Sequence, residues 1–159
     1  MSIDTGPVRA LTRLALPEDN EYLYRLGVAL YGFSSITSLM TEVITYLDPL
    51  ASRNELQLLT SGDVLDNFRH AAKGWNGPSI SKPAKEAARE FEKLNTERSD
   101  FVHAYPITGS NGAQILHRRV DSKQKYFEVT SDFLEHFISR LHEVSSSLYE
   151  IRGIVRPEL

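Results

Sequence analysis

Four stretches of the chain carry apolar residues at the three- and four-residue spacing of an amphipathic helix. The first runs from Glu18 to Leu47 and stops before Pro49, because a proline disfavours the helical conformation of the residue that precedes it. The others run from Asp63 to Lys73, from Pro83 to Tyr105 and from Ser131 to Arg152. These patterns predict an all-α fold, an antiparallel helical bundle of four main helices.

The pattern changes between the third and fourth predicted helices. Gln114 to Val120 and Lys125 to Val129 are short runs typical of strands, with a polar connection between them. We therefore expect a small β-hairpin insertion before the last helix. Ala51 to Leu59 fits either a short helix or a loop.

Length and composition indicate one folded domain. The chain has 159 residues, of which 41% are hydrophobic and 25% charged, as in an ordinary globular protein. Residues 1–17 contain Gly6, Pro7 and Pro17 without a clear period, and we expect a flexible N-terminal arm there. The prediction is a single helical domain over residues 18–153, followed by a loose tail over 154–159.

Charge and cysteine content exclude several classes of chemistry. A net charge of -3 creates no global field that attracts nucleic acid, so any such contact must come from a local patch. The sequence has no cysteine, which excludes disulfides and thiolate sites and fits a reducing cytoplasm. We expect no metal, no cofactor and no membrane span, since no segment approaches about 18 uninterrupted apolar residues.

The third predicted helix carries an arginine in the middle of its apolar stripe. On a helical projection Arg98 lies within roughly 60° of Phe91 and Phe101. Burying a guanidinium without a partner would lower the stability of the fold by roughly several kcal/mol. Arg98 therefore needs a carboxylate, a carbonyl group or a second subunit as its partner. Glu42 and Asp66 are candidate carboxylates.

A histidine follows on another side of the same helix. His103 is turned by roughly 140° from Arg98 and shares its side with Ser99. One regular helix therefore cannot easily direct both side chains at one atom. Either the helix ends near Tyr105, which precedes Pro106, or the pair is completed across a two-fold interface. We expect a homodimer through this helix and the long first helix.

The string Arg98, four residues, His103, one residue, Tyr105 resembles the signature of the HEPN superfamily of small all-α domains, many of them ribonuclease toxins. The resemblance implies a dimer that cuts RNA without a metal, with Arg98 and His103 as the catalytic pair and Ser99 or Asp100 orienting the imidazole. Within the superfamily, this motif is most similar to that of toxins whose antitoxin is a minimal nucleotidyltransferase. That likeness implies a toxin-antitoxin or phage-defence role, with Tyr105 as the residue that the antitoxin modifies.

The chemistry of the pair suits 2'-hydroxyl transesterification. The unperturbed pKa of a histidine, about 6.5, allows His103 to act as general base or general acid. Arg98 can hold the scissile phosphate with two parallel hydrogen bonds and stabilise its extra charge.

The most basic local stretch lies in the expected hairpin and contains the candidate RNA-binding residues Arg118, Arg119, Lys123 and Lys125. Such side chains more often form a solvated face that protects an exposed strand edge. The alternative function is a non-catalytic dimerising adaptor, in which Arg98 is a buried structural ion pair and His103 an ordinary helix-end cation. Ser99 favours this alternative, because the family usually has Asn, Asp or His at that position.

Overall fold

The computed structural model describes residues 4–11, 16–119 and 126–159. Over these residues the protein is mainly helical, with six helices and a small antiparallel sheet. The elements are α1 (Gly6–Leu11), α2 (Asn20–Leu47), α3 (Arg53–Leu56), α4 (Ser61–Gly74), α5 (Ser81–Val102), β1 (Tyr105–Thr108), β2 (Gln114–Arg119), β3 (Tyr126–Val129) and α6 (Ser131–Val155).

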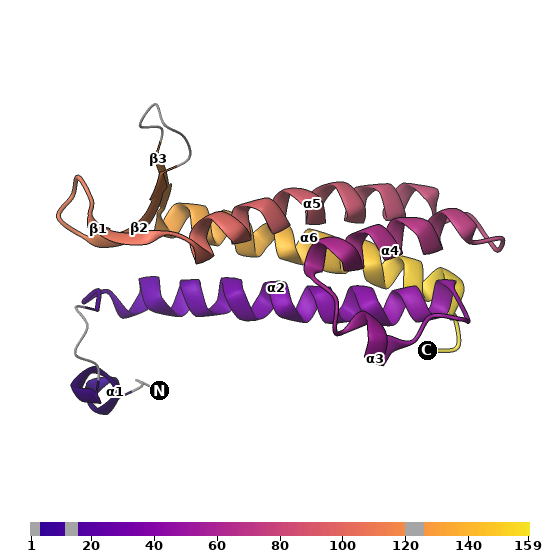
Figure 1. Cartoon of the computed structure of the whole chain (residues 1–159), viewed down its shortest axis with the longest axis horizontal. Helices are drawn as coiled ribbons and strands as arrows, with labels where there is room; N and C mark the ends of the chain where they lie inside the picture. The colour runs from indigo at the N-terminus through magenta and orange to yellow at the C-terminus, as the bar shows by residue number, and fades with distance from the viewer. Residues whose placement is uncertain (1–3, 12–15, 120–125) are drawn as a thin grey trace.

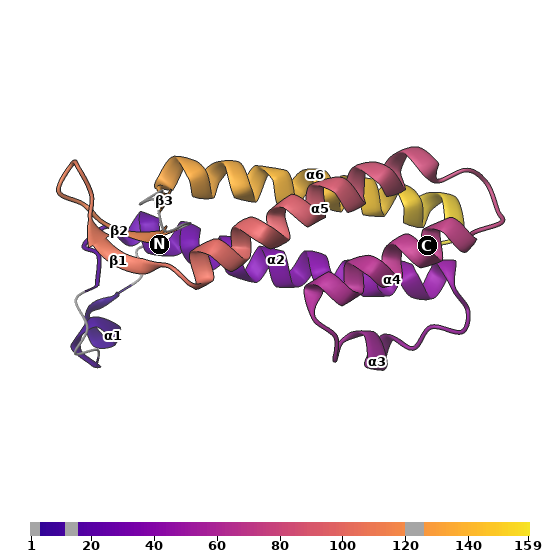
Figure 2. The ribbon, with the colours of Figure 1, turned by 45° about the horizontal axis from the view of Figure 1, so that its top comes forward.

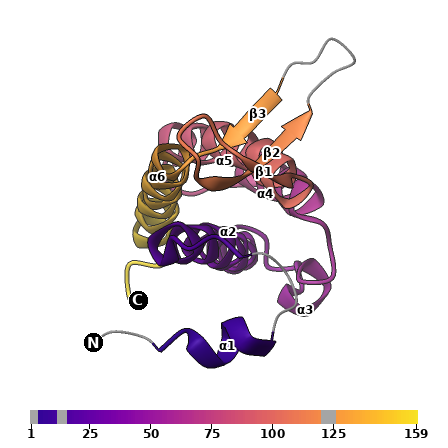
Figure 3. The ribbon, with the colours of Figure 1, turned by 90° about the vertical axis from the view of Figure 1, so that its left-hand side faces the viewer.

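The long helices pack side by side around one apolar core. α2 lies along α6 and α4, and α5 packs on both α6 and α4 (Figures 1 and 3). The largest fully buried side chains come from all four of these helices and include Met40, Phe68, Phe91, Phe101 and Phe137. The predicted helical class is thus confirmed, and each predicted helix corresponds to an observed one.

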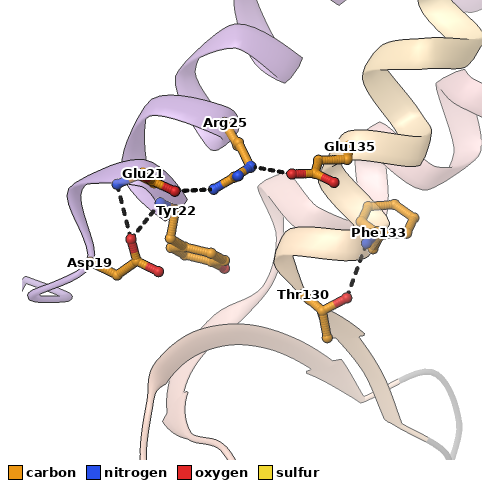
Figure 4. Close-up of polar contacts among 7 residues, drawn as sticks. All are labelled: Asp19, Glu21, Tyr22, Arg25, Thr130, Phe133 and Glu135. Carbon is orange, nitrogen blue, oxygen red and sulfur yellow. Dashed lines mark hydrogen bonds and ion pairs between the residues drawn. The ribbon is translucent and has the colours of Figure 1, made fainter.

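Side-chain caps determine where three of these helices begin. The Asp19 carboxylate accepts hydrogen bonds from the backbone amides of Glu21 and Tyr22, so α2 starts two residues later than predicted (Figure 4). The hydroxyls of Thr60 and Thr130 cap α4 and α6 in the same way. α6 continues to Val155, three residues beyond its predicted end.

The β-sheet differs from the predicted hairpin because it has a third strand. Its order is β1-β2-β3, with both pairs antiparallel and Tyr105 opposite His117. α5 ends at Val102 rather than at Tyr105, because Pro106 disfavours a helical Tyr105 and the freed residues pair with β2. The sheet lies at one end of the helices (Figures 1 and 2).

A buried tyrosine of α2 fastens this sheet to the helices. The Tyr22 hydroxyl donates to the Val129 carbonyl at 2.9 Å and accepts from the Leu116 amide at 3.0 Å. Burial raises the pKa of Tyr22, against the lowering effect of the Leu116 hydrogen bond. The neutral hydroxyl therefore bridges α2, β2 and β3.

The N-terminal part differs from a wholly irregular arm, because it contains α1, none of whose residues is buried. Arg9 of this helix donates to the Pro17 carbonyl and to the Asn20 side chain. Among the described helices, α2 is the one whose length and composition would allow it to cross a membrane, a weak indication that core helices also give. The division into arm, domain and tail stays a prediction.

Candidate functional site

Arg98 lies half-buried between α5, α4 and α2. Its Nη2 donates to the Ser61 hydroxyl at 3.1 Å and, at 3.4 Å, to the Asn95 side-chain oxygen. The guanidinium lies over the Phe33 ring, 5.1 Å from its centroid. Its Nε is buried without a hydrogen-bond partner. The arginine is therefore held by neutral groups and an aromatic face.

The carboxylate partners predicted for Arg98 are wrong. Glu42 lies 3.9 Å from Arg53 and from Arg152, and Asp66 lies 3.8 Å from Arg69. In the described part of the chain, no carboxylate oxygen lies within 4.0 Å of Arg98. Sequence could not identify its real neighbours, because Ser61 and Phe33 approach Arg98 only through the packing of three helices.

A short hydrogen-bond chain fixes the arginine at the start of α4. The Ser61 hydroxyl accepts from Arg98 and donates to Asn95 at 2.6 Å. Asn95 is three residues before Arg98 on α5, which places both side chains on one side of that helix. The positive charge is solvated by dipoles but not neutralised by an anion.

His103 occupies the end of α5 with an exposed side chain. Its backbone amide donates to the Ser99 carbonyl at 3.2 Å, which closes the last helical turn. Within the described residues, its imidazole makes no hydrogen bond or ion pair. Arg98 packs inward while His103 is exposed, and within the described residues no hydrogen bond joins the two predicted catalytic side chains.

The two residues expected to orient His103 have another partner. Arg118 of β2 donates to the Asp100 carboxylate at 2.8 Å and to the Ser99 carbonyl at 3.4 Å. Both ions of this pair remain partly exposed. Asp100 and Ser99 therefore hold a cation of the sheet beside the end of α5.

The other predicted residues divide between exposed and undescribed positions. Tyr105 starts β1 with 70% of its surface exposed, as a modification site requires. Arg118 is engaged by Asp100. Lys123, Lys125 and the side chain of Arg119 lie outside the described residues.

A buried ion-pair cluster was not predicted. Arg140 of α6 is 8% exposed and donates to Glu90 at 2.5 Å and to Glu97 at 2.7 and 2.9 Å. Burial alone would raise the pKa of Glu90, but hydrogen bonding to Arg140 and the charge of Arg140 lower it below its usual value. The signal was present in the sequence, since Arg140 lies beside Phe137 and Leu141 in the apolar stripe of its helix.

Comparison of the chain with known protein families, with curated proteins and with solved structures finds no match. Over the described residues, no group of histidine, aspartate and glutamate side chains could hold a metal ion.

Proposed function

We propose that this chain is a HEPN-like, metal-independent RNA endonuclease that acts as a homodimer, with a fold of four main helices in an antiparallel bundle. The observation that carries the proposal is the uncompensated charge of Arg98. A half-buried guanidinium that has only neutral partners still favours an anion. A phosphate group is the anion that its planar donors fit best.

The proposed reaction is an attack of a ribose 2'-hydroxyl on the adjacent phosphorus atom. His103 accepts the hydroxyl proton, the 2'-oxygen bonds to phosphorus, and the bond to the 5'-oxygen breaks as that oxygen takes a proton from an imidazolium or water. Arg98 exchanges its hydrogen bonds to uncharged oxygens for stronger ones to the negatively charged non-bridging oxygens of the phosphate. Arg118, held by Asp100 and the Ser99 carbonyl, adds a second cation near the end of α5.

We place the reaction in a composite site, to which one protomer contributes Arg98 and its partner contributes His103, so the two side chains need not meet within one chain. Across a two-fold axis, Arg98 of one protomer can serve with His103 of the other, since every contact occurs twice in such an interface. The exposed Tyr105 is the proposed target of a nucleotidyltransferase antitoxin. The nuclease and this antitoxin would together act as a cytoplasmic toxin-antitoxin or phage-defence system.

A non-catalytic dimerising adaptor is the second candidate. Two observations favour it: Asp100 is engaged by Arg118 rather than by His103, and Arg98 is packed over Phe33. In this version the motif residues only stabilise the end of α5 and its contact with the sheet.

RNA cleavage by the wild type and by His103→Ala, both in EDTA, distinguishes these functions. We expect His103→Ala to cut about a hundredfold more slowly or worse, because proton transfer is lost. Its free energy of unfolding should change by under about 1 kcal/mol, because the side chain is exposed.

The matched control is His70→Ala, which removes another exposed histidine from α4 and should leave cleavage unchanged. Equal cleavage by the wild type and His103→Ala would reject the catalytic role. A well-folded dimer that cuts no RNA would support the adaptor instead.

A further inference from the structure

A hollow opens between α4, the loop that follows it and the first turns of α5. Its volume is about 700 Å³, within the range of small-molecule sites. The floor is apolar and is formed by Phe68, Ala72, Ile80, Ala84 and Ala88. This end of α5 is far from the sheet (Figure 1). Lys85 precedes His103 by 18 residues, or about 27 Å of helix, so the hollow is separate from the proposed cleavage site.

Cations surround the apolar floor. Arg69, Lys73, Lys85 and Arg89 line the hollow, against one carboxylate, that of Glu92. Glu92 is bound by Arg69 at 2.9 Å. Within the described residues, Lys73, Lys85 and Arg89 have no carboxylate within 4.0 Å. A chain with a net charge of -3 thus gathers around one apolar hollow three cations that form no ion pair within 4.0 Å in the described residues. Of these, Arg89 also acts on Glu90 through its charge.

One wall of the hollow is a fixed aromatic ring. The indole N–H of Trp75 donates to the Pro78 carbonyl at 2.9 Å. Gly77 packs against the ring so closely that a Cβ there would lie 2.2 Å from Cζ2. The ring therefore has a set position at the edge of the apolar floor, and it belongs to the only tryptophan in the sequence.

We propose that this hollow binds a small molecule with a planar aromatic body and a phosphate group, of the nucleoside monophosphate type. The apolar floor and the Trp75 ring accept the aromatic body, since flat rings stack favourably on apolar and aromatic surfaces. The phosphate binds to the cations that line the hollow, Lys85 and Arg89 on α5 and Lys73 on α4, which donate hydrogen bonds to its oxygens. A ligand with only one of these two parts would leave either the cations or the apolar floor unused.

Fluorescence of Trp75 provides a direct test, because the chain has no other tryptophan. We expect AMP, the probe, to change the emission saturably, with calorimetry giving the same affinity. Arg89→Glu and Lys85→Glu should each weaken AMP binding by about tenfold or more, because each replaces a phosphate contact by a repulsive charge. Both side chains are exposed, so circular dichroism should be unchanged.

Lys82→Glu is the matched control, since Lys82 is an exposed cation at the start of the same helix but does not line the hollow. It should weaken AMP binding by less than about twofold, since it reverses a charge without removing a contact. Equal weakening by Lys82→Glu would overturn the proposal, because the attraction would then be diffuse. Adenosine binding as tightly as AMP, inorganic phosphate binding as tightly as AMP, or no binding by calorimetry would also overturn it. Binding should be the same in His103→Ala, so this result is independent of the proposed nuclease activity.

Discussion

Arg98 and Arg140 both lie in the apolar stripes of their helices, and their charges are satisfied in different ways. Arg140 is locked between two carboxylates, Glu90 and Glu97. Arg98 has only the dipoles of Ser61 and Asn95 and the ring of Phe33. The first arginine has its counter-ions already and is structural, whereas the second has no counter-ion among the described residues, which is the basis of the proposed phosphate contact.

The structural role of Arg140 predicts a pH-dependent loss of stability in Arg140→Met. At neutral pH the change removes the main cation from the partly buried Glu90 and Glu97 and leaves Glu90 only Lys93 at 3.8 Å. It should cost about 3 kcal/mol of unfolding free energy, the lower end of the range for a broken buried pair. Because Arg140 lowers the pKa of Glu90 in the folded wild type, its contribution is full above the unfolded pKa of about 4.3 and is lost as the pH falls through the folded pKa.

The difference between wild type and variant should therefore narrow on acidification below about pH 4. Urea unfolding at neutral pH and at several acidic values measures it. Arg25→Met is the control, since its partners Glu21 and Glu135 are largely exposed and the change should cost under about 1 kcal/mol. A difference between wild type and Arg140→Met that is constant over this pH range would contradict the assignment.

The sequence predicted the directions of the Arg98 and His103 side chains but not their contacts. The helical projection identified Arg98 as facing inward and His103 as facing another side, because both positions follow from one helical period. It did not identify the partners of either residue. Ser61 is 37 positions from Arg98 in the sequence, and only tertiary packing brings them together.

At the scale of elements, helices were predicted better than the sheet. Apolar periodicity is a local signal, and it predicted the long helices to within a few residues. The caps Thr60 and Thr130 fix where α4 and α6 begin. β1 was missed because Tyr105–Thr108 has no alternating pattern of its own and becomes a strand by pairing with β2. α1 was missed because its six residues bury nothing and so leave no apolar stripe.

The bridge from α2 to the sheet predicts that Tyr22→Phe loosens the sheet. The change leaves the Leu116 amide without its acceptor and the Val129 carbonyl without its donor, at a cost of about 1–3 kcal/mol. Hydrogen exchange of β2 and β3 amides should accelerate, with little change in the amides of α4. Tyr46→Phe is the control, because that hydroxyl bonds only the partly exposed Glu42. Unchanged exchange in β2 and β3 would contradict the role of Tyr22.

For the whole molecule, the proposed dimer must join the ends of two α5 helices that carry Arg98 and His103, and the exposed face of α2 is a second surface that it could cover. Tyr24 and Tyr31 on this face are 68% and 80% exposed. A hollow of about 460 Å³ beside Tyr31 is lined by Ser34, Ser35, Ser38 and Tyr149, among others. Two charged residues, Glu42 and Arg53, also line this hollow and lie 3.9 Å from each other. An exposed ring beside a shallow hollow of this kind is suited to a self-complementary contact, in which each protomer inserts its ring into the other.

Light scattering should therefore give about twice the 18.0 kDa mass of the chain at micromolar concentration. Tyr31→Glu should shift the protein to monomers without unfolding it, because it buries a charge in the interface but not in the folded chain. Leu58→Glu, at an exposed apolar position outside α2, is the control and should remain dimeric. A wild type that scatters only as an 18.0 kDa species would contradict the dimer.

A purified heterodimer of Arg98→Lys with His103→Ala shows whether Arg98 and His103 of different protomers form one site. In that heterodimer one composite site carries both changes and the other carries neither, so roughly half of the wild-type cleavage should return. Both variant homodimers should be nearly inactive. A heterodimer as inactive as the two homodimers, beside an active wild type, would contradict the composite site.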